Sequence, residues 1–136
     1  MNTNMKNIFF QRAFKQAIDV TAHKSRLLRL VAQLLFKLQQ VNWKDANTHA
    51  IKSKFFVFGR LSKAYASGQY RHIPLKAILI VVAAIIYFVN PLDLLPDIIP
   101  IAGFTDDFAI LLWAYSSINS EISKFLEWER SHQPLT

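Results

Sequence analysis

Two uncharged apolar runs, separated by a segment rich in proline and aspartate, constrain the fold of this chain most. Each run holds thirteen residues, Ala77 to Val89 and Phe108 to Ser120. Apolar runs of this length without strand-like alternation are typical of helices that are buried or inserted in a membrane. No β-type alternation or internal repeat occurs elsewhere, so the sequence predicts an all-α fold, a small helical bundle.

The first run is borderline in length for a membrane span. Sixteen uncharged residues separate Lys76 from Asp93, which gives roughly 24 Å of helix against the ~30 Å of bilayer hydrocarbon. Two membrane spans, a shallow re-entrant hairpin and a water-soluble bundle with a very apolar centre all stay open, and we favour two spans. In that arrangement the positive-inside rule places both ends of the chain in the cytoplasm.

Charge divides the chain into two unequal halves. Residues 1–76 hold 14 Lys and Arg against two aspartates, whereas residues 77–136 hold two basic and seven acidic residues. A basic half favours an anionic partner, either nucleic acid or the cytoplasmic face of a membrane. The adjacent apolar runs and the mean hydropathy of +0.19 favour the membrane. The chain has no cysteine, which excludes disulfides and thiol chemistry.

The basic half shows helical periodicity in two stretches. Apolar residues at helical spacing from residue 6 to about 41 predict one amphipathic helix. The same spacing from Ile51 to Tyr65 predicts a second helix, which ends at Gly68, a typical residue at a helix end. Such helices pack into a bundle or lie on anionic lipid, and the pattern allows both. The cations that we expect to contact anionic lipid or a partner are Lys52, Lys54, Arg60, Lys63, Arg71 and Lys76. Aromatic residues lie among them, but nucleic acid is the less favoured ligand.

The connector between the apolar runs carries helix-start signals. Asn90 is a predicted N-cap followed by Pro91, with Asp93 three residues after the cap. Thr105 is a second predicted N-cap, and the two aspartates after it would lie in the first turn of the next helix. Pro96 and Pro100 interrupt any long regular helix between these two starts.

A divalent cation site is the sharper interpretation of the same acidic residues. Mg²⁺ and Ca²⁺ prefer carboxylate oxygens, and a tight turn could bring four aspartates together. The spacing is not that of an EF-hand, and caps or salt bridges explain most of these carboxylates. We therefore predict no cofactor and no catalytic residue, with a divalent cation as the alternative. Its ligands would be Asp93, Asp97, Asp106 and Asp107.

From about Gly68 to Leu112 the chain resembles the YkvA-like family, a bacterial domain of unknown function. The resemblance rests on an ordered set of glycine, aromatic, proline and aspartate positions. These are Gly68, Gln69, Tyr70, Arg71, Pro74, Tyr87, Pro91, Asp93, Pro96, Asp97, Pro100, Gly103, Asp106 and Asp107. The resemblance implies a membrane-associated helical hairpin closed by the connector, and it implies no activity.

These observations predict one structural unit made of a basic amphipathic region, residues 1–67, and a hydrophobic hairpin, residues 68–136. The leading function is a non-enzymatic protein of the bacterial plasma membrane, which anchors its basic cytoplasmic region to anionic lipid or to a partner, either another protein or a second copy. One alternative is a metal-dependent enzyme acting on a phosphate-bearing lipid, with Arg71 or Lys76 as a phosphate contact. The other is a soluble helical adaptor.

Overall fold

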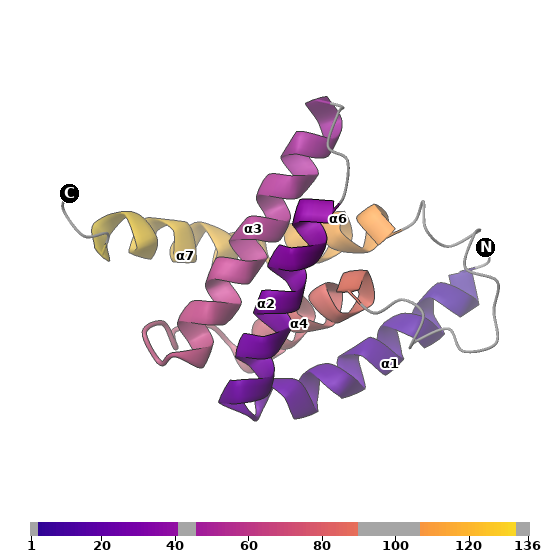
Figure 1. Ribbon diagram of the computed structural model, residues 1–136, viewed down its shortest axis with the longest axis horizontal. Coiled ribbons are helices and arrows are strands. Elements are labelled where there is room, and N and C mark those ends of the chain that lie inside the picture. Colours follow the sequence, from indigo (N-terminus) through magenta and orange to yellow (C-terminus); the bar gives the residue numbers. More distant parts are fainter. Residues whose placement is uncertain (1–2, 41–45, 90–106, 133–136) are drawn as a thin grey trace.

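The structure, a computed structural model, describes residues 3–40, 46–89 and 107–132, and all of its regular elements are helices (Figure 1). The all-α prediction is confirmed, and no strand occurs among the described residues. The helices are α1 (Thr3–Thr21), α2 (Lys24–Gln40), α3 (Ala46–Ala66), α4 (Leu75–Val89), α6 (Asp107–Ser117) and α7 (Asn119–His132).

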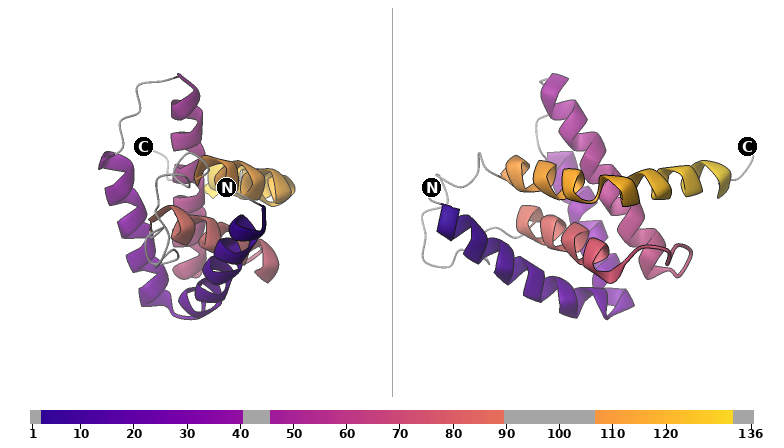
Figure 2. Two further views of the ribbon diagram at one scale, coloured as in Figure 1. Left: turned by 90° about the vertical axis from the view of Figure 1, so that its right-hand side faces the viewer. Right: turned by 180° about the vertical axis from the view of Figure 1, so that it is seen from behind.

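The helices form two crossing layers. In one layer α2 and α3 lie side by side, and in the other α4 lies between α1 and α6 (Figures 1 and 2). The two layers meet where α4 contacts α2 and α3 and where α6 contacts α3. Helix α7 continues α6 almost in line after a turn at Ile118 and extends past the other helices (Figure 2). The basic N-terminal helices therefore pack directly on the most apolar helix of the chain.

Helix α4 forms the centre of the core. Pro74 precedes it, and the N–H of Ile78 donates to the carbonyl oxygen of Pro74 at 3.1 Å, so the helix starts where proline predicts a start. Every side chain from Ala77 to Phe88 is buried. Near the end of the helix the rings of Phe55 and Phe88 stack with their centroids 4.1 Å apart. Apolar residues on all sides of α4 are thus accounted for by burial within the protein.

Among the described residues, no helix combines the length and the apolar character needed to cross a bilayer. The prediction of two transmembrane spans therefore has no support in the described part of the chain.

The expectation of one continuous helix from residue 6 to about 41 is wrong. Helix α1 ends at Thr21 and α2 begins at Lys24, and the N–H of His23 donates to the carbonyl oxygen of Val20 at 3.1 Å, a tight closing turn. A continuous helix would place Lys24 on the buried stripe, because it follows the buried Ala17 by seven residues. The turn leaves Lys24 exposed.

Gly68 ends α3 as the sequence predicts. Its φ of +81° lies in the left-handed region that glycine tolerates best. The N–H of Gly68 donates to the carbonyl oxygen of Tyr65 at 3.1 Å, and the N–H of Tyr70 donates to that of Ala64 at 3.2 Å. These bonds satisfy carbonyl groups that the end of a helix leaves without partners.

Candidate functional site

The predicted connector lies almost entirely outside the described residues. Asp107 is the first residue of α6, two positions after the predicted N-cap at Thr105. Among the described residues, no group of three or more His, Asp or Glu side chains could hold a metal ion. The divalent cation site stays a prediction. The predicted residues outside the described part are Asn90, Pro91, Asp93, Pro96, Asp97, Pro100, Gly103, Thr105 and Asp106.

Four of the six predicted contact cations take part in interactions within the fold, and three of them, Lys52, Lys54 and Arg60, lie on α3. The Nζ atoms of Lys52 and Lys54 lie over the rings of neighbouring aromatic residues, 5.9 Å and 4.9 Å from the centroids. Arg60 forms a two-bond ion pair with Glu129 of α7, with Nε to Oε2 at 2.7 Å and Nη2 to Oε1 at 3.1 Å. The contacts of Lys54 and Arg60 join α3 to α6 and α7, whereas the contact of Lys52 with Phe56 lies within α3.

The other three predicted cations are exposed near the end of α3 and the start of α4. Lys63 lies in the last turn of α3, and Arg71 and Lys76 lie just before and just inside α4. The guanidinium carbon of Arg71 lies 4.3 Å from the ring centroid of Tyr65. Stacking on this ring restricts the Arg71 side chain, so the cation is held at a defined place on the surface.

An open pocket of about 530 Å³ lies beside Arg71. Helix α1 and the turn after it form one wall, and the end of α3 and the start of α4 form the other. This volume falls within the roughly 300–1,000 Å³ typical of small-molecule sites. We call it the basic pocket, and its lining residues are Ile18, Thr21, Ala22, Lys24, Tyr65, Ala66, Arg71, Leu75 and Leu79.

The basic pocket combines cations with large exposed apolar side chains. Ile18 is 53% exposed and Leu75 is 61% exposed, although both are large aliphatic residues. Each lines the same pocket as Lys24 and Arg71. Isolated exposed apolar residues are ordinary, but their concentration beside cations is the pattern of surfaces that meet both the headgroups and the acyl chains of a lipid layer.

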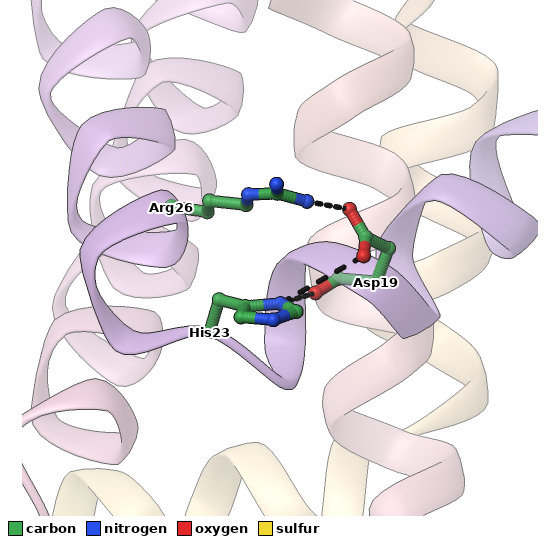
Figure 3. Close-up of polar contacts among 3 residues, drawn as sticks. All are labelled: Asp19, His23 and Arg26. Atoms are coloured by element: carbon green, nitrogen blue, oxygen red, sulfur yellow. Dashed lines mark hydrogen bonds and ion pairs between the residues drawn. The ribbon is translucent and has the colours of Figure 1, made fainter.

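A small polar cluster shapes the turn that forms one wall of the pocket (Figure 3). The guanidinium group of Arg26 on α2 pairs with the carboxylate of Asp19 on α1. The Nδ1–H of His23 donates to the backbone carbonyl oxygen of Asp19 at 2.9 Å, since a carbonyl oxygen only accepts. These contacts tie the end of α1 to the start of α2 and so hold Lys24 in place.

Comparison with known proteins identifies the family. A family model described as a protein of unknown function, DUF1232, matches residues 77–113. An uncharacterized membrane protein of Bacillus subtilis (strain 168), YkvA, is 37% identical over 71 residues, which is 52% of this chain and 67% of the relative. The chain belongs to the YkvA-like family. No solved structure matches.

The segment shared with the family covers only part of the basic pocket. The matched residues begin at Ala77 and take in most of α4 and the first part of α6. Leu79 is the one lining residue within the matched residues 77–113, and the other eight lining residues precede them. The sequence predicted Arg71 as a contact but missed Ile18 and Lys24. The available signal for Lys24 was its charge at a position on the apolar stripe.

Proposed function

We propose that this YkvA-like protein is a non-enzymatic, membrane-associated helical protein that docks on anionic lipid through the end of the bundle that carries the basic pocket. One observation carries the proposal: the exposed Ile18 and Leu75 line one pocket together with Lys24 and Arg71. Apolar side chains contribute to membrane binding by leaving water for the acyl boundary, and cations contribute by attraction to anionic headgroups. The anionic cytoplasmic leaflet of the bacterial plasma membrane is the matching surface.

The charge around the pocket supports a lipid with negative charge. Asp19 is the only acidic residue in the described ranges 3–40 and 46–89, and it pairs with Arg26. Lys63 and Lys76, both exposed, lie within two residues in sequence of the pocket residues Tyr65 and Leu75. The Bacillus subtilis relative is named as a membrane protein, which supports this proposal.

Vesicle co-sedimentation tests the proposal. Full-length protein is expected to sediment with vesicles of phosphatidylglycerol and phosphatidylcholine, and far less with phosphatidylcholine alone. Each basic residue near an anionic surface contributes about 1 kcal/mol, so the Lys24→Gln/Arg71→Gln variant should bind anionic vesicles about thirtyfold more weakly. Added salt should weaken wild-type binding, because it screens these charges.

A variant with the same change in net charge supplies the control. Lys124 and Arg130 are exposed on α7, so Lys124→Gln/Arg130→Gln removes two positive charges without touching the pocket. This control should keep most of the wild-type vesicle binding. An equal loss in the two double variants would contradict docking through this end of the bundle, and wild-type protein that ignores anionic vesicles would overturn the proposal.

A further inference from the structure

We infer that the basic pocket binds one anionic lipid molecule, with its phosphate on Lys24 and Arg71 and part of one acyl chain against the apolar wall. This inference rests on the proposed function and deepens it, because it assigns a defined ligand site within the docking surface. Contact with a membrane needs only a charged and partly apolar surface. A binding site for one molecule needs an enclosing space as well, and the pocket supplies about 530 Å³.

The apolar part of the pocket fits an acyl chain. Ile18, Leu75 and Leu79 come from two different helices, α1 and α4, and line the same space. Leu79 is almost completely buried at 8% exposure, whereas Leu75 is 61% exposed. The lining therefore passes from open to buried along the first turns of α4, and burying a chain there removes apolar surface from water on both partners.

The polar part of the pocket fits a phosphate group. Lys24, the first residue of α2, and Arg71, in the loop before α4, both line the pocket, and neither has an ion-pair partner among the described carboxylates. Arginine presents paired N–H donors that match two phosphate oxygens, and stacking on Tyr65 holds the Arg71 group in place before the ligand arrives. The hydroxyl oxygen of Thr21, another lining residue, has no hydrogen-bond partner among the described residues.

The joint presence of these two parts favours a lipid over free phosphate. A free phosphate ion would use the two cations and leave the exposed Ile18 and Leu75 facing water. A neutral or zwitterionic lipid would use the apolar wall and leave Lys24 and Arg71 without a net opposite charge. An anionic amphiphile matches both parts of the pocket. Small-molecule sites typically combine an apolar lining with a few polar groups that orient the ligand.

Titration calorimetry with dihexanoylphosphatidic acid, a short-chain lipid used below its micelle concentration, tests this site without a membrane. The full-length protein is expected to bind it saturably with one site, and to bind dihexanoylphosphatidylcholine and inorganic phosphate at least tenfold more weakly. Ala22 lines the pocket and is exposed, so Ala22→Trp should fill the pocket and weaken binding of the short-chain lipid at least tenfold. Ala32 on α2 lines a separate pocket beside Phe36, and Ala32→Trp should leave that binding unchanged.

The same variants separate the pocket from the docking surface. Ala22→Trp keeps every cation, so its binding to phosphatidylglycerol vesicles should stay within about threefold of wild type. Lys24→Gln/Arg71→Gln should lose both vesicle binding and binding of the short-chain lipid. Vesicle binding without saturable uptake of the short-chain lipid would overturn the pocket and leave the proposed function standing. Uptake that Ala22→Trp does not weaken, or that inorganic phosphate matches, would also overturn it.

Discussion

Tyr70 illustrates how the fold selects one protonation state of a buried side chain. It lies just after α3, is 3% exposed, and its ring centroid lies 5.3 Å from that of Phe125 and 5.1 Å from that of Trp128. Burial, and then the nearby carboxylate of Glu121, raise the pKa of the Tyr70 hydroxyl above its ordinary value of 10.0. The folded protein thus favours the neutral phenol. The ring contacts of Tyr70 pack α7 against the loop before α4.

This raised pKa predicts how stability responds to alkaline pH. The Tyr70 hydroxyl keeps its proton to higher pH in the folded state than in the unfolded state. Its contribution to folding stability is therefore complete below the unfolded pKa of about 10 and is lost as pH rises through the folded pKa. Urea unfolding between about pH 9 and about pH 11 should show the wild type losing stability more steeply than Tyr70→Phe. Parallel curves for the two proteins would contradict this assignment.

At the scale of the helices, α4 shows what hydrophobic periodicity predicts and what it leaves open. The uncharged run predicted a helix from Ala77 to Val89, and α4 spans Leu75–Val89. The run does not reveal what covers the helix, because apolar residues on every side are typical of both a membrane span and a core helix. Packing against α1, α2, α3 and α6 answers that question, and these contacts join segments distant in sequence.

Burial of α4 inside the bundle predicts the cost of shortening its side chains. Ile85 is fully buried, so Ile85→Ala leaves a cavity and should lower the free energy of unfolding by about 2–5 kcal/mol. Leu75 is exposed on the same helix, and Leu75→Ala should change that free energy by less than about 0.5 kcal/mol. Chemical denaturation of both variants checks the prediction, and similar effects at the two positions would speak against α4 as the core helix.

The break between α1 and α2 is the element that sequence patterns placed wrongly. Apolar residues recur at helical spacing on both sides of it, so the stripe alone indicates one long helix. The turn accompanies contacts that are visible only in three dimensions, because α1 packs mostly on α4 whereas α2 packs mostly on α3. The exposed pair of Asp19 and Arg26 joins the two helices across the turn. A lysine on an apolar stripe, Lys24, was the available signal.

For the whole molecule, the sequence predicted the all-α class, the family and one lining residue of the basic pocket, Arg71. Lys63, Arg71 and Lys76 were predicted contacts, and they are exposed near the start of α4. The pocket wall formed by α1 could not be predicted, since it depends on how α1 packs against α4, about 60 residues later in the chain. The predicted division at residue 67 and the predicted metal ligands stay predictions.

The orientation of the bundle on a membrane is the central claim, and a single attached fluorophore tests it most directly. The chain has no cysteine, so Leu75→Cys and Leu112→Cys each create one labelling position at an exposed leucine, the first in the pocket and the second on α6. With an environment-sensitive dye, phosphatidylglycerol vesicles should shift the emission of the label at position 75 to shorter wavelength and leave that at position 112 unchanged. A shift at position 112 alone, or at neither position, would contradict docking through the basic pocket.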